Sequence, residues 1–350
     1  MNFLRPVHGT TDEVLGALAE WLAAPGEPEP LVVATSGSTG RPKQVLLSRR
    51  AMLASAEATH QRLGAPGRWL LTLPISYVAG LQVAIRSLLA GQPPIVVDDD
   101  WTAAVEQLDG VGYTSLVPTQ LHRILTDADA HGDGGAALAA LTRLDAVLLG
   151  GGPLDPALRA RAEAAGVRVI ATYGASETSG GCVYDGVPLP GALVEIDAES
   201  RIRLGGATIF DGYLDDPELT AETLRDGWYL TSDLGRIVDG RLQVLGRADD
   251  VVISGGVKVP MPAVAARLRE HPDVDLVEMV GLPDPEWGQR VVAVVTGAAA
   301  PELVALRAWV ADRLDRRWAP QQLVRLAALP LLDNGKPDRA EIRRLAEEAR

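Results

Sequence analysis

Residues 145–174, DAVLLGGGPLDPALRARAEAAGVRVIATYG, determine the predicted fold of the chain. An apolar run at 145–151 closes on glycine, and a second apolar run at 167–174 does the same. The segment 155–166 between them places apolar residues three and four positions apart, which is the period of an amphipathic helix. A strand, a helix and a strand in this order predict two parallel strands joined by a crossover helix.

The same alternation extends from residue 31 to about residue 175. Strands are predicted for LVVAT, QVLLS, RWLLTLP, PPIVV and YTSLVP, and helices for SRRAMLASAEATHQRLG, VAGLQVAIRSLLAG and PTQLHRILTDADA. Between about 181 and 247 helical patterns are absent, and short strands with turns indicate a small β subdomain. After 249 strands and helices return. We predict an α/β protein with an N-terminal domain at 1–248 and a small mobile C-terminal α+β domain at 249–350.

Composition and charge restrict the classes of partner. The chain has 350 residues, of which 47% are hydrophobic, and a formal net charge of -13, which argues against disorder and against binding nucleic acid. The single cysteine, Cys182, cannot form an internal disulfide. No signal-peptide pattern and no run of about 18 apolar residues occurs, so we expect a cytoplasmic protein without membrane insertion. The sequence leaves the oligomeric state open, and a homodimer is one alternative.

The stretch from Thr35 to Lys43, TSGSTGRPK, follows a predicted strand and allows two interpretations. It can be a turn between two strands of a hairpin, because short runs of glycine and serine are common in turns. It can also be a loop whose amides, hydroxyls and lysine surround the phosphates of a nucleotide. The chain contains three lysines, Lys43, Lys258 and Lys336, among 33 basic residues. Their rarity suggests positions that need a compact ammonium group.

Six motifs in order resemble the adenylate-forming superfamily, which contains acyl-CoA synthetases, luciferases and adenylation domains of peptide synthetases. They are TSGSTGRPK at 35–43, TYGASET at 172–178, LTSDLG at 230–235, GRADD at 246–250, SGGVK at 254–258 and DNGKP at 333–337. The resemblance covers about residues 31–345. It implies a two-domain enzyme that uses ATP, Mg²⁺ and CoA.

The resemblance also implies a role for each matching residue. The implied catalytic residues are Lys336, Glu177 and Thr178, with Glu177 also holding Mg²⁺. The implied nucleotide-binding residues are Thr35, Ser36, Gly37, Ser38, Thr39, Lys43, Gly151, Gly152, Tyr173, Asp233 and Arg247. Gly255 and Gly256 would face CoA in the thioester step, and Asp249 would be the hinge between domains. The family more often has Glu-Asn where this chain has Val257-Lys258, so no role is carried over to Lys258.

Two segments, 73–88 and 148–153, look like the acyl pocket of o-succinylbenzoate-CoA ligases of menaquinone biosynthesis. In that resemblance the substrate contacts Tyr77, Arg86 and Gly150, and Arg86 faces its second carboxylate. A charge in the apolar segment VAGLQVAIRSLLAG must face either solvent or an anionic ligand. The family commonly has an aromatic-His pair where this chain has Ser76-Tyr77.

The expected reaction joins o-succinylbenzoate, CoA and ATP into o-succinylbenzoyl-CoA, AMP and pyrophosphate. Two alternatives share every nucleotide motif: a ligase for another carboxylic acid, and a stand-alone adenylation protein that loads a separate carrier protein. About 30 residues precede Thr35 here. The family usually has a longer segment there, so a truncated first subdomain is expected.

Overall fold

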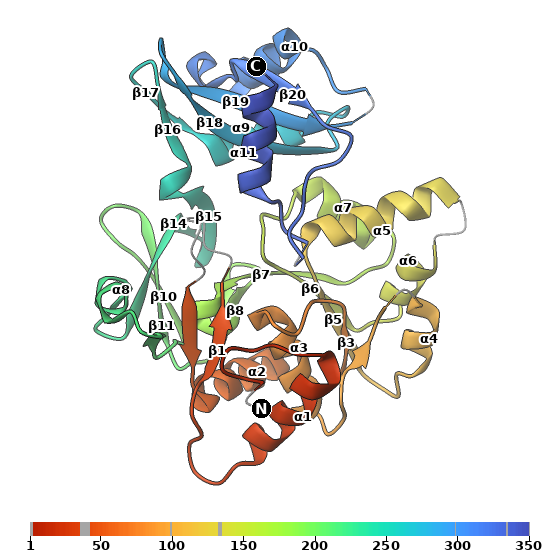
Figure 1. The fold of residues 1–350 in the computed structure, drawn as a ribbon. Helices are drawn as coiled ribbons and strands as arrows, with labels where there is room; N and C mark the ends of the chain where they lie inside the picture. The colour runs from red at the N-terminus through yellow and green to blue at the C-terminus, as the bar shows by residue number, and fades with distance from the viewer. Residues whose placement is uncertain are drawn as a thin grey trace. The chain divides into compact units, whose positions relative to one another are not determined.

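The computed structural model describes residues 3–35, 43–98, 100–131, 135–297, 299–333 and 335–349. The chain folds into two compact units, which Figure 1 shows as a ribbon. The first unit comprises Met1–Asp197, Ile202–Thr231 and Ile237–Leu242, and the second comprises Ala198–Arg201, Ser232–Arg236 and Gln243–Arg350. The predicted domain boundary between residues 248 and 249 stays a prediction.

A seven-stranded sheet forms the centre of the first unit, in the order β4-β3-β5-β6-β7-β8-β9. The strands from β4 to β7 pair in parallel, and β8 and β9 continue the sheet in antiparallel pairing. The strands are β3 (Arg68–Leu71), β4 (Ile95–Val96), β5 (Gly112–Leu116), β6 (Ala146–Leu149), β7 (Val169–Ala175), β8 (Gly180–Tyr184) and β9 (Val187–Pro188). The parallel pair β6 and β7 is the one that the segment 145–174 predicts.

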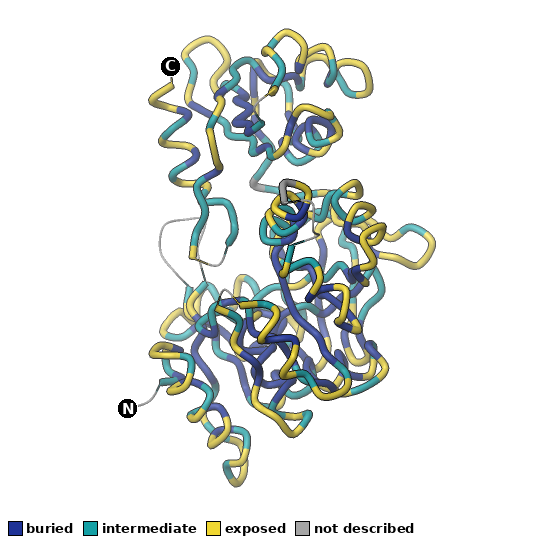
Figure 2. The backbone as a smooth tube through the Cα atoms, turned by 90° about the vertical axis from the view of Figure 1, so that its right-hand side faces the viewer, coloured by how far each residue is buried: buried dark blue, intermediate teal, exposed yellow. Residues whose placement is uncertain are grey.

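Helices cover both faces of this sheet because successive strand residues point in opposite directions. In β6, Ala146 and Leu148 belong to one apolar core, and Val147 and Leu149 belong to the other. The first core includes residues of α1 (Thr11–Ala23), α2 (Arg49–Leu63) and α3 (Val78–Leu89). The second includes residues of α4 (Trp101–Glu106), α5 (Pro118–His131), α6 (Ala136–Leu141) and α7 (Pro156–Ala164). In Figure 2 the central strands are dark blue, which marks them as buried.

Two smaller sheets are separate from the central sheet. One has the order β1-β2-β12, with β1 (Leu31–Ala34), β2 (Gln44–Leu47) and β12 (Gly212–Tyr213). The other contains β10 (Ala192–Ile196), β11 (Arg201–Gly206), β13 (Leu224–Arg225), β14 (Trp228–Val238) and β15 (Arg241–Arg247). The expectation of no helix in this segment is wrong, because α8 (Pro217–Thr223) forms there. Asp216 caps α8 by accepting a hydrogen bond from the Leu219 amide.

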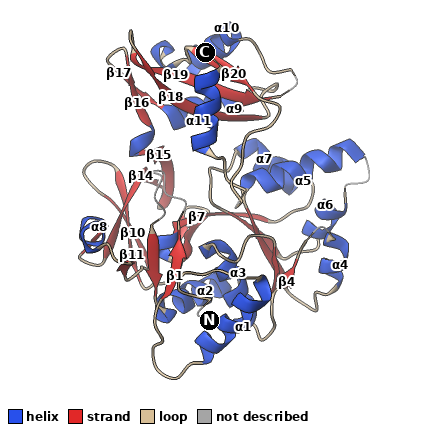
Figure 3. Ribbon diagram, in the orientation of Figure 1, coloured by secondary structure: helices blue, strands red, loops and turns tan. Residues whose placement is uncertain are grey.

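The second unit contains a five-stranded sheet with helices on both faces, coloured by secondary structure in Figure 3. Its strands are β16 (Val251–Ser254), β17 (Val257–Pro260), β18 (Leu276–Asp284), β19 (Gly288–Thr296) and β20 (Gln322–Arg325). In β19, Val291, Ala293 and Val295 share a core with α9 (Met261–Arg269) and α10 (Leu303–Arg313). The alternate residues Val292 and Val294 share a core with α11 (Arg339–Glu348). The predicted fold class, α/β with a smaller α+β unit, is confirmed.

Candidate active site

The predicted phosphate loop begins and ends on adjacent antiparallel strands. Thr35 donates its backbone N–H to the carbonyl of Lys43 at 2.9 Å, directly beyond the pair Ala34 and Gln44. Four of the predicted nucleotide-binding residues, Ser36, Gly37, Ser38 and Thr39, lie outside the described residues. The hairpin that was one interpretation of the sequence is therefore present, and its two ends place Thr35 and Lys43 side by side.

Tyr213 connects the predicted lysine and the predicted magnesium ligand. Its hydroxyl donates a hydrogen bond to Oε1 of Glu177 at 2.7 Å, and Nζ of Lys43 lies 5.3 Å from the centroid of its ring. Burial and the Glu177 carboxylate raise the pKa of Tyr213, so the phenol stays protonated and remains a donor. Tyr213 is not among the site residues predicted from the sequence. Tyr213 lies near Lys43 because β12 pairs with β2, and this pairing places Tyr213 opposite Val45.

The turn after β7 holds Glu177 in a fixed position. Glu177 and Thr178 lie in a single 3₁₀ turn, Ser176–Thr178, and both are buried. The Thr178 hydroxyl accepts a hydrogen bond from the Ala175 amide at 2.8 Å and donates one to the Gly180 carbonyl at 2.7 Å. This hydroxyl therefore stabilises the turn that carries Glu177. Its predicted catalytic role stays a prediction.

The carboxyl end of β6, where the predicted glycine segment begins, lies beside the middle of β7, because Leu149 pairs with Ala171. A Cβ atom on Gly150 would collide with the Thr172 hydroxyl, which itself donates to the Leu149 carbonyl at 3.1 Å. Gly151 and Gly152 are exposed, and Tyr173 is half-buried against the first core. Loops at the carboxyl ends of parallel strands are the usual ligand positions of such sheets. The structure thus brings the glycine segment and the TYGASET motif to one edge.

Tyr77 and Arg86 lie at opposite ends of α3. Tyr77 is the N-cap residue, and Arg86 lies in the last turn, so about 13 Å of helix axis separates them. Arg86 is 3% exposed, and its guanidinium lies 5.1 Å from the centroid of the Trp69 ring. The solvent-facing interpretation of Arg86 is therefore wrong. In the part of the chain that the structure describes, no carboxylate forms an ion pair with Arg86.

The remaining partners of Arg86 are polar but uncharged. The Tyr184 hydroxyl contacts Arg86 and shares a 3.0 Å hydrogen bond with Oγ1 of Thr59. His60, which is not among the site residues predicted from the sequence, is 9% exposed and lies close enough to Arg86 for the two to interact electrostatically. Burial, followed by the positive charge of Arg86, lowers the pKa of His60 to about 4. The amphipathic pattern of α2 does not predict that His60 interacts with Arg86, because the sequence does not show which helix packs against α2.

Asp233, Arg247 and Asp249 lie near the junctions of the chain between the two units. Asp233 is a half-buried residue of β14, and Arg247 ends β15 immediately before the 3₁₀ turn Ala248–Asp250. The side chain of Asp249 is not described. Arg339 at the start of α11 donates to Oδ1 of Asp250 at 2.9 Å. The predicted ribose contacts and the hinge stay predictions.

Gly255 and Gly256 form the turn between β16 and β17. Both have positive φ, at 55° and 76°, which glycine adopts without strain. A Cβ atom on Gly255 would lie 2.7 Å from the Trp287 ring, and the Gly255 amide donates to the Trp287 carbonyl at 2.9 Å. Trp287 remains 41% exposed. The predicted thioester turn therefore packs against an exposed aromatic residue that is not among the site residues predicted from the sequence.

Lys336 lies in the loop that precedes α11. Its carbonyl accepts a hydrogen bond from the Leu332 amide at 2.8 Å, and the neighbouring Pro337 forms a bridge with Leu331. Burial lowers the pKa of Lys336 from its ordinary value. A partly desolvated ammonium is suited to contact an anion directly.

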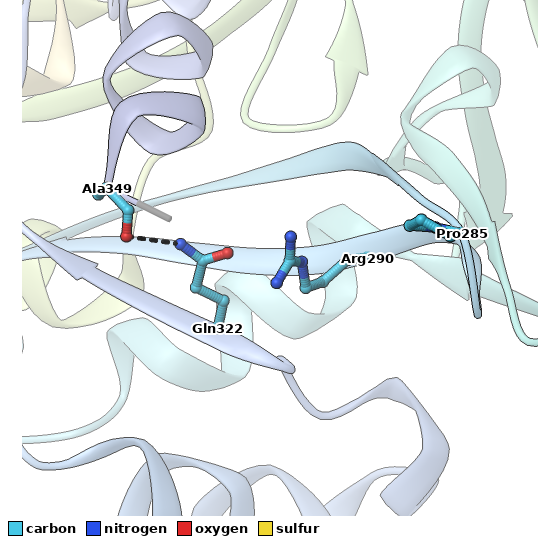
Figure 4. Close-up of a pocket in the computed structure, with 4 residues that line it drawn as sticks. All are labelled: Pro285, Arg290, Gln322 and Ala349. Atoms are coloured by element: carbon cyan, nitrogen blue, oxygen red, sulfur yellow. Dashed lines mark hydrogen bonds between the residues drawn. The ribbon is translucent and has the colours of Figure 1, made fainter.

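A separate cavity of about 450 Å³ lies in the second unit. Figure 4 shows its lining residues, Pro285, Arg290, Gln322 and Ala349. Gln322 donates to the Ala349 carbonyl at 3.3 Å, and Arg290 lies 3.4 Å from Oδ2 of Asp284. No predicted site residue lines this cavity.

Three further features concern metal binding, membrane insertion and the single thiol. Among the described residues, no three His, Cys, Asp or Glu side chains gather as a metal cluster. None of the described helices has the length and apolar character to cross a bilayer. Burial raises the pKa of the Cys182 thiol to about 12, which keeps it protonated.

Comparison with known proteins agrees with the motif order. Residues 24–206 match the family described as AMP-binding enzyme, and residues 263–336 match the AMP-binding enzyme C-terminal domain. The chain is 46% identical over 336 residues to the probable 2-succinylbenzoate--CoA ligase of Mycobacterium tuberculosis. This alignment covers 91% of the present chain and 85% of that relative.

Two solved structures are similar in fold. One is a variant of Escherichia coli MenE with bound OSB-AMS, at 30% identity and a TM-score of 0.76, covering 91% of this chain and 69% of that one. The other is the amide bond synthetase McbA from Marinactinospora thermotolerans, at 28% identity and a TM-score of 0.77, covering 89% and 68%. The chain belongs to the AMP-binding enzyme family.

Proposed function

We propose that the chain is an ATP-dependent CoA ligase for 2-succinylbenzoate in menaquinone biosynthesis. The succinyl carboxylate attacks the α-phosphorus of ATP, which gives the acyl-adenylate and pyrophosphate. The CoA thiol then attacks the acyl carbon and displaces AMP, which leaves the thioester. The motif order and the 46% identity to the Mycobacterium tuberculosis relative support this reaction.

The burial of Arg86 is the observation that carries the substrate assignment. A guanidinium at 3% exposure without a carboxylate partner among the described residues is unfavourable unless an anion binds there. A dicarboxylic acid supplies one carboxylate for activation and a second for Arg86. Tyr77 at the other end of α3 and Gly150 at the end of β6 would contact the rest of the acid.

The nucleotide would bind between Lys43, which precedes β2, and the TYGASET motif, which contains Tyr173 and Glu177. In this proposal Lys43 and the loop at 35–43 hold the β- and γ-phosphates, and Tyr173 stacks on adenine. Gly151 and Gly152 contact the nucleotide, and Asp233 and Arg247 bind the ribose. Positioning and charge neutralisation would supply most of the rate enhancement.

Glu177 can supply a carboxylate ligand to a nucleotide-bound Mg²⁺. Mg²⁺ in such sites usually takes one or two carboxylates and otherwise phosphate and water oxygens. Glu177 has one oxygen held by Tyr213 and is buried, so its orientation is fixed before any ion arrives. When bound, Mg²⁺ would neutralise phosphate charge.

The second unit would serve the two half-reactions with different residues. Lys336 would neutralise the charge that develops during adenylation. Gly255 and Gly256 would let pantetheine approach the backbone, and the exposed Trp287 ring beside them offers an apolar contact. A rotation about Asp249 would exchange the two sets of residues.

Pyrophosphate exchange with a panel of acids tests the proposal. The panel contains 2-succinylbenzoate, benzoylpropionate, which lacks the ring carboxylate, and benzoate. We expect exchange to be fastest with 2-succinylbenzoate, followed by thioester formation with CoA. Faster exchange with another acid would overturn the assignment of 2-succinylbenzoate as the substrate. Transfer to a carrier protein in place of CoA would overturn the assignment of CoA as the acceptor.

The cytoplasm is the proposed location, since ATP and CoA are available there. A homodimer stays a prediction that light scattering of the purified protein checks directly.

A further inference from the structure

Three side chains of the first unit each have a buried nitrogen atom that has no hydrogen-bond partner among the described residues. These atoms are Nε2 of His60, Nε of Arg86 and Nε1 of Trp69. The residues come from α2, α3 and β3, and all three are at most 9% exposed. Buried polar atoms in proteins are nearly always hydrogen-bonded to protein or ordered water, so a group of them without a partner in the described chain marks a place for bound water or a ligand.

The charge of the surroundings defines what that ligand must be. The charge of Arg86 from α3 acts on His60, and Tyr184 from β8 contacts both Arg86 and Thr59, the neighbour of His60 on α2. On its own helix, Arg62 donates to the Tyr184 carbonyl at 3.0 Å and is directed to that backbone. The cluster therefore contains a buried positive charge and, among the described residues, no negative one. An anion with several acceptor oxygens satisfies both the charge and the donors.

His60 differs from Arg86 because it can change its protonation state at physiological pH. Burial and Arg86 keep the imidazole neutral when the cluster is empty. A carboxylate placed against Arg86 would cancel the charge that repels a proton from His60 and would accept a hydrogen bond from the imidazolium.

We infer that His60 completes the Arg86 subsite for the ring carboxylate of the substrate, and that His60 takes up a proton from solvent when this carboxylate binds. This inference rests on the proposed function, because it takes 2-succinylbenzoate as the occupant. His60 is then a substrate-binding residue that determines specificity for a dicarboxylate. It performs no chemistry on the activated carboxylate.

The inference makes recognition of the ring carboxylate pH-dependent in a defined direction. A group whose pKa rises on binding increases affinity as the pH falls through its bound-state pKa. The benzoate carboxylate itself stays largely ionised above about pH 5. Preference for 2-succinylbenzoate should therefore increase as the pH is lowered from about 7.5 to about 5.5.

The test compares kcat/KM for 2-succinylbenzoate and for benzoylpropionate by pyrophosphate exchange across that pH range. The ratio of the two values cancels the pH dependence of all steps that both acids share. We expect the ratio to rise about threefold or more at the lower pH in the wild type. In His60→Gln, which keeps a hydrogen-bond donor but cannot bind the proton, we expect a constant ratio.

A direct measurement covers the case in which His60→Gln does not fold. The chain has five histidines, so their Cε1 proton signals can be followed by NMR through a pH titration. One buried histidine should titrate at a higher pH with 2-succinylbenzoate than without it, and benzoylpropionate should leave it unchanged.

Each result decides the inference. A wild-type ratio that does not change with pH, or one that changes equally in His60→Gln, overturns the role of His60 and leaves the proposed function intact. A histidine titration that 2-succinylbenzoate does not shift has the same meaning. Absence of any exchange with 2-succinylbenzoate, while another acid is activated, overturns the proposed function and this inference together.

Discussion

The Tyr213 hydroxyl donates a 2.7 Å hydrogen bond to Oε1 of Glu177, and the Tyr213 ring carries the ammonium of Lys43 on its face. One aromatic residue thus orients two groups of opposite charge that the sequence places 134 positions apart, from Lys43 to Glu177. The Tyr213 hydroxyl contacts the Glu177 carboxylate and the ring contacts Lys43, so a substitution can remove one contact and keep the other.

Tyr213→Phe removes the hydroxyl and keeps the ring beneath Lys43. We expect the Mg²⁺ concentration for half-maximal pyrophosphate exchange to rise several-fold, because Glu177 loses the donor that fixes its orientation. Loss of one hydrogen bond to a buried carboxylate should also destabilise the protein by about 2 kcal/mol. Tyr113→Phe is the matched control, since that phenol donates to the Ala65 carbonyl at 3.1 Å. An equal Mg²⁺ dependence in both variants contradicts the role given to Tyr213.

Arg86→Met should improve stability and impair substrate binding. The substitution removes a buried charge that has no carboxylate partner among the described residues, so we expect a higher Tm. The KM for 2-succinylbenzoate should rise by about tenfold or more, and the KM for ATP should change little. Arg62→Met, on the neighbouring helix, controls for the loss of an arginine. A lower Tm with an unchanged KM indicates that Arg86 is a structural residue.

His60 should reduce stability in acid because its pKa in the folded protein lies below the ordinary value. The unfolded chain binds the proton more tightly, so stability is lost as the pH falls from about 6.5 to about 4. The slope from this one group approaches about 1.4 kcal/mol per pH unit within that range. Urea unfolding at several pH values checks it. The wild type should lose more stability across that range than His60→Gln, and parallel curves rule out a buried neutral His60.

The sequence predicted the parallel strands but could not predict what packs around Arg86. The pattern of 145–174 depends on neighbouring residues, and β6, α7 and β7 form where it indicates. Arg86, in contrast, is buried by Trp69 from β3 and Tyr184 from β8. Those contacts depend on how distant elements pack, so the sequence left both solvent and an anionic ligand open for Arg86.

Two other differences have local causes. The sequence TTDE at 10–13 contains the Thr10 and Glu13 capping box that begins α1, a helix outside the elements predicted from the sequence. Tyr213 reaches Glu177 through the pairing of a two-residue strand, β12, which is too short to produce a periodic pattern. The motif order predicted Lys43 and Glu177 as site residues, and the fold adds Tyr213, which contacts both.

Gly255→Ala tests the turn assigned to the thioester step. Alanine would have to adopt φ near 55°, and its Cβ would meet the Trp287 ring at 2.7 Å. Either the turn or Trp287 must move, so we expect slower transfer of a preformed acyl-adenylate to CoA, by about tenfold or more. Pyrophosphate exchange should be nearly unchanged. Gly240→Ala is a control, because it has a similar positive φ and open space around its Cβ.

Lys336→Ala should have the opposite effect on the two half-reactions. A partly desolvated ammonium is a stronger electrostatic partner for the charge that develops at the α-phosphate than a hydrated one, because less water must be displaced. Its loss should lower pyrophosphate exchange by about 100-fold or more and leave thioester formation from preformed acyl-adenylate nearly intact. The two variants should therefore differ in opposite ways: Lys336→Ala slows adenylation and spares thioester formation, and Gly255→Ala slows thioester formation and spares adenylation. Equal loss of both half-reactions in Lys336→Ala would show that the lysine serves both steps, and the division of labour proposed for the second unit would be wrong.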